Sequence, residues 1–190
     1  MFQVRIHGRG GQGVVTGAEM LALAAFLEGR YSQAFPSFGS ERMGAPVVAF
    51  CRISDQEIRL REPVTMPDAL LIQDPTLLHQ VDLFSGLSKS GFILINSGKS
   101  PDELGLSGLP YPEDHLLAFP ATEIALKHIG RPLPNSSLLG GFCALTGEIG
   151  IDSLKEAIGR RFSGKTAKDN MAAAEASFTI VGESMHAATD

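Results

Sequence analysis

The fold is decided near the start of the chain, by Phe2-Gln3-Val4-Arg5-Ile6-His7-Gly8-Arg9-Gly10-Gly11-Gln12-Gly13-Val14. Apolar and polar residues alternate over 2–7, which predicts a short strand that stops at glycine. Gly8, Gly10 and Gly13 fit the pattern G-x-G-x-x-G, and residues 14–27 have the composition of a helix. The sequence therefore predicts a strand, a glycine loop and a helix in immediate succession.

Such a loop suits a phosphate group, because glycines leave backbone N–H groups bare at the N-terminus of a helix. Arg9 could add a positive charge. The alternative is a tight strand-to-helix turn with no ligand. A nicotinamide dinucleotide fits poorly, because the predicted second strand, 31–35, has no Asp, Glu or Arg to hold the ribose. The loop also lacks the Lys-Ser/Thr pair of an ATP-binding P-loop. A different phosphate-bearing ligand is expected.

The rest of the chain alternates strands and helices first and ends in helices. We predict strands at 31–35, 47–53, 58–60, 69–72, 91–96 and 116–119, and helices at 14–27, 76–87, 121–129, 138–149, from about 153, and at 165–181. The strands at 47–53 and 58–60 would form an inserted β-hairpin. The fold class is α/β: a three-layer Rossmann-like domain with a mainly parallel sheet and C-terminal helices. Residues 1–182 would form this single domain, and 183–190 a flexible tail.

Three details of these elements can be checked. Ser153 and Glu156 have the spacing of a capping box, with Asp152 as an alternative helix cap. Gly140 and Gly141 predict close packing of the helix that carries them. His7, at the end of the first strand, is expected to be a hydrogen-bonded structural histidine; contact with a ligand of the adjacent loop is the alternative.

Composition excludes several classes of protein. Charged residues are only 19% and the net charge is −5 with no long run of either sign, which argues against nucleic-acid or anionic-membrane binding. Cys51 and Cys143 stand alone in apolar stretches, so this chain cannot build a disulfide scaffold or a Cys-ligated zinc or iron–sulfur site. No secretion signal or membrane span is evident, so a cytoplasmic location is expected.

The low charge content also suggests that partner subunits cover part of the surface. Two segments are candidates: the helix at 14–27, which is apolar almost all round, and the loop that contains Phe35 and Phe38. For the two phenylalanines, inward packing as core is the alternative.

Three blocks in order resemble the gamma subunit of the 2-oxoacid:ferredoxin oxidoreductases, most closely that of pyruvate synthase, also called pyruvate:ferredoxin oxidoreductase. The blocks are Gly8-Arg9-Gly10-Gly11-Gln12-Gly13-Val14-Val15-Thr16, then Phe35-Pro36-Ser37-Phe38-Gly39-Ser40-Glu41-Arg42-Met43-Gly44-Ala45-Pro46, then Arg52-Ile53-Ser54-Asp55. Asp74, Gly91 with Ile95-Asn96, Asn135 to Gly140 and the final helix from Lys165 to Asn170 also match. Gly17 departs from the family, which more often has Ala there.

The resemblance implies a division of labour. The parent enzyme decarboxylates a 2-oxoacid on thiamine diphosphate, passes electrons through iron–sulfur clusters to ferredoxin, and releases CO2 and an acyl-CoA, here acetyl-CoA. Thiamine diphosphate and the clusters would belong to alpha, beta and delta-type partner subunits. The gamma glycine loop is associated with coenzyme A. The expected contacts are Gly8, Arg9, Gly10, Gly11, Gln12, Gly13 and Val14, with Arg9 or Arg42 as a counter-charge to the pyrophosphate.

Two other functions stay open on the sequence alone. The chain could be a stand-alone nucleotide-binding oxidoreductase that uses the same loop. It could also be a purely structural subunit whose loop contacts only a neighbouring subunit.

Overall fold

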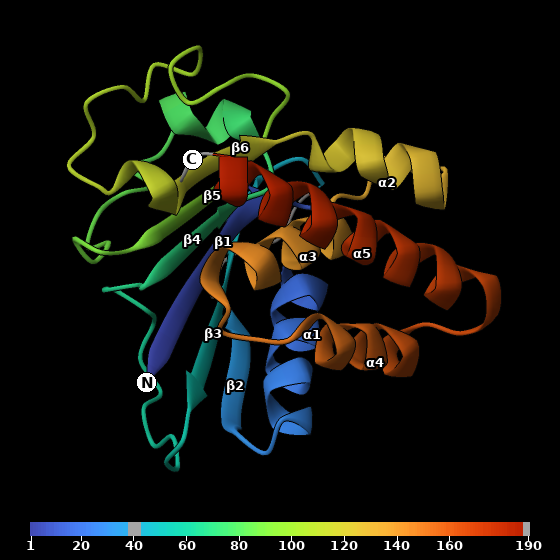
Figure 1. Ribbon diagram of the computed structural model, residues 1–190. Helices are drawn as coiled ribbons and strands as arrows, with labels where there is room; N and C mark the ends of the chain where they lie inside the picture. Colours follow the sequence, from blue (N-terminus) through green and yellow to red (C-terminus); the bar gives the residue numbers. More distant parts are fainter. Residues whose placement is uncertain (38–42, 188–190) are drawn as a thin grey trace.

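A six-stranded sheet forms the centre of the computed structural model, which describes residues 1–37 and 43–187. The strand order in this described part is β2-β3-β1-β4-β5-β6 (Figure 1). The strands are β1 (Phe2–Arg9), β2 (Tyr31–Pro36), β3 (Pro46–Ser54), β4 (Ala69–Ile72), β5 (Phe92–Asn96) and β6 (Leu116–Phe119). β1, β4, β5 and β6 are parallel neighbours, whereas β3 runs antiparallel to both β1 and β2. The mainly parallel α/β sheet is therefore confirmed.

The predicted hairpin between residues 47–53 and 58–60 is wrong. Residues 58–60 form no strand, and β3 pairs instead with β2, from Tyr31 opposite Ser54 to Pro36 opposite Ala49. The other edge of β3 pairs with β1, from Phe2 opposite Ile53 to Arg9 opposite Pro46. Both edges of β3 are thus occupied, which leaves no hydrogen-bonding edge for the segment that follows it.

The α-helices gather on one side of the sheet (Figure 1). They are α1 (Val14–Leu27), α2 (Ala121–Ile129), α3 (Asn135–Thr146), α4 (Ile151–Arg161) and α5 (Gly164–Ala187). Loops and two short 3-10 helices, η1 (Pro75–His79) and η2 (Glu113–His115), provide the third layer. This agrees with the expected three-layer architecture, with loops in place of helices on the second face.

Two hydrophobic clusters lie on opposite faces of the sheet. The first joins alternate strand residues such as Val4, Ile6 and Leu71 to the helices. The second joins the intervening β4 and β5 residues, such as Leu70 and Ile93, to the loops that follow those strands. The side chains of a strand alternate between its faces, so β4, β5 and β6 contribute to both clusters, whereas β1, β2 and β3 contribute only to the first. All cluster residues that lie in α-helices belong to the first cluster.

Several local predictions are wrong. Residues 76–87 contain only the short helix η1 and then turns, in which Gly86 has a φ of 74°. No capping box forms at α4: its N-cap is Gly150, and the N–H of Gly150 donates to Glu28 Oε1 at 2.8 Å. α3 begins at Asn135, three residues before the predicted start. α5 continues to Ala187, six residues beyond the predicted end at 181.

The chain itself covers the apolar helix. α1 packs against β2, β3 and α4, and its residues from Val14 to Ala25 are mostly buried. Phe26, 64% exposed, is its large apolar exception. The expectation that partner subunits cover α1 is therefore wrong, because the C-terminal helices return to this face.

Candidate functional site

The glycine loop begins inside the first strand. β1 extends through Gly8 and Arg9, which lie opposite Val47 and Pro46 of β3. Gly13 is the N-cap residue of α1, with a left-handed φ of 75° and no side-chain hydrogen bond capping the helix. The predicted order of strand, loop and helix is confirmed, but the irregular part is confined to residues 10–13.

A small pocket of about 320 Å³ opens at the N-terminus of α1. It is lined by Arg9, Gly10, Gly11, Gly13, Val14, Val15, Thr16 and Val47. The first turn of α1 contains no acidic residue. The first N–H groups of a helix have no acceptor within the helix and carry its positive dipole end. The pocket therefore suits an anion.

Two of the loop glycines are required by their surroundings. Gly11 has a φ of 94°, and a Cβ there would lie 2.9 Å from Met43 Sδ. Gly13 has a φ of 75°, and its Cβ would lie 2.8 Å from Asn135 Nδ2. Side chains at these positions would be strained by the backbone and would push against Met43 and Asn135.

The structure brings together the first two blocks of the sequence. The N–H of Gly10 donates to the carbonyl of Ala45 at 2.9 Å, and the N–H of Gly44 donates to the carbonyl of Gly10 at 3.1 Å. An isolated β-bridge pairs Gly10 with Met43. Residues 43–45 thus lie directly beside the glycine loop. Arg42 and Phe38 belong to this segment but lie outside the described residues.

Arg9 is tied to the end of β4. Its Nε donates to Asp74 Oδ2 at 3.1 Å, and its other nitrogens donate to the Gly44 carbonyl, Thr76 Oγ1 and Gln80 Oε1. Gln12 folds back between the same groups, accepting from the Arg9 N–H at 2.8 Å and donating to Asp74 Oδ2 at 3.0 Å.

Asp74 holds this network in its charged form. Burial opposes ionisation, but hydrogen bonds from the side chain and backbone of Thr76, a hydrogen bond from Gln12 and the charge of Arg9 outweigh it, so the pKa of Asp74 is lowered. Asp74 was absent from the sequence-predicted site because no local pattern connects it with Arg9, 65 positions away.

The site lies where the chain changes direction in the sheet. After β1 the chain enters α1 on one face, and after β4 it enters η1 on the other. β1 and β4 are parallel neighbours, so their carboxyl ends meet beside the glycine loop. In open α/β sheets, ligands bind outside the carboxyl ends of the strands at such a switch point.

The arrangement of strands disfavours a nicotinamide dinucleotide further. In dinucleotide-binding domains the second strand lies parallel beside the first and places its terminal acid near the ribose. Here antiparallel β3 occupies that position, and β2 lies at the sheet edge beyond it. The missing acid in residues 31–35 and the strand order lead to the same conclusion.

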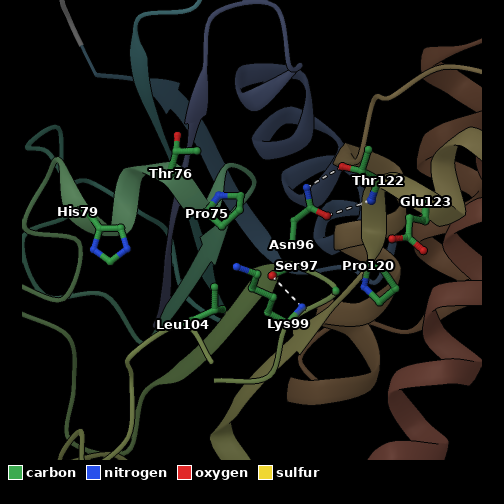
Figure 2. Close-up of a pocket in the computed structure, with 11 residues that line it drawn as sticks. Pro75, Thr76, His79, Asn96, Ser97, Lys99, Leu104, Pro120, Thr122 and Glu123 are labelled. Atoms are coloured by element: carbon green, nitrogen blue, oxygen red, sulfur yellow. Dashed lines mark hydrogen bonds between the residues drawn. The ribbon is translucent and has the colours of Figure 1, made fainter. Parts of the chain in front are cut away.

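A second cleft, of about 550 Å³, lies at the carboxyl ends of β4, β5 and β6 (Figure 2). Asn96 orders it: its amide donates to Thr122 Oγ1 at 2.8 Å, and its carbonyl accepts from the Thr122 N–H at 2.9 Å. Lys99, Thr76 and Glu123 are among the lining residues. Thr76 also binds Arg9, so the cleft adjoins the glycine-loop network. The sequence did not predict this cleft, because its residues follow three separate strands.

The remaining candidate residues have other roles. Cys51 and Cys143 are buried free thiols, and burial raises the pKa of Cys143 to about 12. Among residues 1–37 and 43–187, no group of three or more His, Cys, Asp or Glu side chains could hold a metal ion. The described helices include none long and apolar enough to cross a bilayer. His7 is buried, but its Nε2 has no hydrogen-bond partner in this part of the chain, unlike the structural histidine expected.

Fold and site together define a Rossmann-like α/β protein with an anion pocket at the switch point of its sheet. The model of the family pyruvate ferredoxin/flavodoxin oxidoreductase matches residues 3–180. The chain belongs to this family.

Relatives and solved structures agree with that assignment. The "Pyruvate/ketoisovalerate oxidoreductases common subunit gamma" of Thermococcus litoralis is 46% identical over 185 residues, which cover 96% of this chain and 100% of that protein. The crystal structure of pyruvate oxidoreductase subunit PORC from Thermotoga maritima has a TM-score of 0.82 and 34% identity, covering 94% of this chain and 95% of that one. The chain is thus a gamma subunit of a pyruvate or related 2-oxoacid:ferredoxin oxidoreductase complex, and other subunits of the complex are its partners.

A more distant structure shares the fold. It is 2-oxoglutarate:ferredoxin oxidoreductase from Magnetococcus marinus with 2-oxoglutarate, coenzyme A and succinyl-CoA bound, with a TM-score of 0.72 and 18% identity. The match covers 96% of this chain and 31% of that longer one.

Proposed function

We propose that this subunit contributes a coenzyme A site to its complex, with the pyrophosphate on the backbone amides at the N-terminus of α1. The main support for this proposal is the pocket lined by Gly10, Gly11, Gly13 and the first residues of α1, at the switch point of the sheet. Coenzyme A offers a pyrophosphate without needing a ribose-clamping acid at the end of the second strand. The structure of the Magnetococcus enzyme, which has coenzyme A bound, includes a chain with this fold.

The proposal revises the role of Arg9. Its guanidinium already binds Asp74, Thr76, Gln80 and the Gly44 carbonyl, so it shapes the pocket wall more than it offers a free charge. Gln12 has the same character, because both ends of its amide are engaged within the loop. The N–H groups of Gly10 and Gln12 are already bonded, to the carbonyls of Ala45 and Arg9. The amides of Gly11 and of residues 13–16 are then the main anion donors, and Arg42 is the expected additional cation.

The wider reaction is proposed from the family. The complex would decarboxylate pyruvate on thiamine diphosphate, reduce ferredoxin through iron–sulfur clusters, and form acetyl-CoA and CO2. Two buried cysteines on separate elements do not fit a cluster site, so both cofactors are assigned to alpha, beta and delta-type companion subunits. Residues 1–182 would act as one gamma-type domain in the cytoplasm.

Calorimetric titration of the assembled complex with coenzyme A tests the site. Gly11→Ala adds a methyl group beside the amides, and we expect its affinity for coenzyme A to fall by at least about 10-fold, or ~1.4 kcal/mol. Gly108→Ala is the matched control, because Gly108 also has a positive φ (76°) but no atom within 4 Å of an added Cβ. Pantetheine, which has no pyrophosphate, should bind both variants equally.

A purely structural loop would give a different result. Equal coenzyme A affinity in the wild type, Gly11→Ala and Gly108→Ala would refute the proposed contact. If Gly11→Ala lowered the affinity for pantetheine as much as the affinity for coenzyme A, the lost contact would not be to the pyrophosphate.

A further inference from the structure

Half of the second sheet face carries polar side chains in place of a hydrophobic cluster. On β1, Val4 and Ile6 point into the helix-side cluster, so Arg5 and His7 lie on the opposite face. Phe50 and Arg52 of β3 lie beside them, opposite Arg5 and Gln3 in the register. Extended segments around Glu62 and Ser85 cross this face and accept hydrogen bonds from it.

Two guanidinium groups are buried on this face without a carboxylate. Arg5 is 9% exposed and Arg52 is 2% exposed. Within the described chain, neither forms a salt bridge, and their hydrogen bonds all go to neutral oxygens. A buried charge is expensive unless it is paired, and arginine does not escape by losing its proton. Asp82 and Glu62 act on Arg5 and Arg52 only at longer range, so in the described chain neither guanidinium has a carboxylate bonded directly to it.

The two arginines differ in how fully they are bound. All three nitrogens of Arg52 donate: to Gln3 Oε1 at 3.1 Å, Gln33 Oε1 at 3.2 Å and the Glu62 carbonyl at 2.6 Å. Its guanidinium also stacks 5.2 Å from the centre of the Phe35 ring. The guanidinium of Arg52 therefore has all its nitrogens hydrogen-bonded within the chain and has a structural role. The Phe35 ring packs against Arg52 and against the Phe50 ring.

Arg5 is incomplete. Only Nη2 donates, to the carbonyls of Leu83 at 2.6 Å and Ser85 at 2.8 Å. Its Nε is buried with no acceptor in the described residues, and His7 Nε2, on the same face two residues along, is in the same state. Both residues line a pocket of about 310 Å³, here called the Arg5 pocket, together with Ser37, Val48, Phe50, Val64, Thr65, Asp82 and Ser85.

The walls of the Arg5 pocket are preformed. Gly86 lies directly against the Thr65 carbonyl, where an added Cβ would be only 2.0 Å from the oxygen. This contact holds the segment of Thr65 beside the segment of Ser85. Asp82 is exposed at the rim and acts on Arg5 only at longer range, without a hydrogen bond or ion pair.

We propose that the Arg5 pocket receives a carboxylate side chain from a companion subunit of the oxidoreductase complex. A carboxylate entering the pocket could accept from the Arg5 guanidinium, whose Nη1 donates to no group in the described residues. The adjoining segment exposes Leu60 and Met66, the latter 69% exposed, and apolar groups around a charged pocket are typical of a protein interface. This inference rests on membership of a multi-subunit complex and not on the coenzyme A site.

Filling the pocket from within the chain tests the proposal. Thr65→Glu places a carboxylate in the pocket beside Arg5, and Thr65→Gln is the uncharged control of similar size. The companion subunits, purified without this chain, are titrated with each variant by interferometry. We expect Thr65→Glu to weaken assembly by at least about 10-fold, because the site is already occupied, and Thr65→Gln to stay within about 2-fold of wild type.

Stability measurements separate docking from misfolding. Thr65→Glu should melt at or above the wild-type temperature, because it pairs a buried cation. Ser85→Glu, from the other wall, should reproduce the loss of assembly if Thr65→Glu folds poorly. Equal assembly by all variants would overturn the proposal. A second result would also overturn it: free acetate raises the melting temperature of the wild type but of none of the variants, and assembly is unchanged. The pocket would then bind a small free anion.

Discussion

Gly140 of α3 lies against the backbone of α5, which makes Gly140→Ala a sharp test of the helix layer. A Cβ at this position would stand 2.0 Å from the carbonyl oxygen of Ala174 and 2.8 Å from its Cα. Both are backbone atoms, so no side-chain rotation can make room. The variant can fold only if α3 and α5 move apart.

The size of the effect follows from that distance. Ordinary contact for a Cβ begins at 3.4 Å, so the helices must separate by about 1.4 Å, the difference between 3.4 and 2.0 Å. This loosens the packing around Ala173, Ala174 and Val181, all fully buried. We expect a loss of about 3–4 kcal/mol, offset by about 1 kcal/mol from the better helix propensity of alanine. The net loss of about 2–3 kcal/mol lowers the Tm by roughly 5–10 °C.

Urea and thermal unfolding of the purified chain measure this change. Gly182→Ala, on α5, is the matched control because no atom lies within 4 Å of its added Cβ. That variant should be stabilised by about 0.5–1 kcal/mol, the ordinary gain from replacing a helical glycine. If Gly140→Ala proved as stable as Gly182→Ala, the close approach of α3 and α5 would be refuted.

Two further predictions concern pH. Burial, aided by Arg5, lowers the pKa of His7 from 6.5 to about 3, so the unfolded chain binds the extra proton between these values and stability falls as the pH falls below 6.5. Urea unfolding should show a loss of up to ~2 kcal/mol from pH 7 to pH 5 that His7→Gln abolishes; an unchanged pH slope in His7→Gln would contradict this. The pKa of Asp74 is lowered, so its ion pair with Arg9 stabilises the fold fully above about pH 4 and progressively less as the pH falls further. Asp74→Asn should therefore be less stable than wild type by about 1–3 kcal/mol at pH 7, with the difference shrinking in acid, whereas exposed Asp114→Asn should differ little at either pH; an Asp74→Asn deficit that does not shrink at all between pH 7 and pH 3 would argue against the pairing.

Local patterns predicted most elements close to their observed positions. The alternation in Phe2–His7 gave β1, and the glycines at 8–13 gave the loop and the start of α1. The short apolar runs at Ala69–Ile72 and Phe92–Asn96 gave the buried parallel strands β4 and β5. These signals lie within a few residues of each other along the chain, so they can be recognised without knowing the fold.

The errors came from contacts between distant residues. Residues 58–60 look like a strand, but β1 and β2 already occupy both edges of β3. The apolar surface of α1 resembles an interface in the sequence, but α4, more than 100 residues further along the chain, packs against it. Asp74 joined the site only because parallel pairing places the end of β4 beside Arg9.

The sequence by itself therefore determined the strand, glycine loop and helix, the α/β class and the family resemblance, because backbone conformation and periodicity act locally. Only the tertiary structure decided which strand edges were free, which apolar face was covered, and which charges were left unpaired. Arg5 shows the reason most clearly. The residues beside it in the sequence are those of an ordinary strand. Its buried, incompletely hydrogen-bonded state depends on Leu83, Ser85 and His7 meeting on one face of the folded sheet.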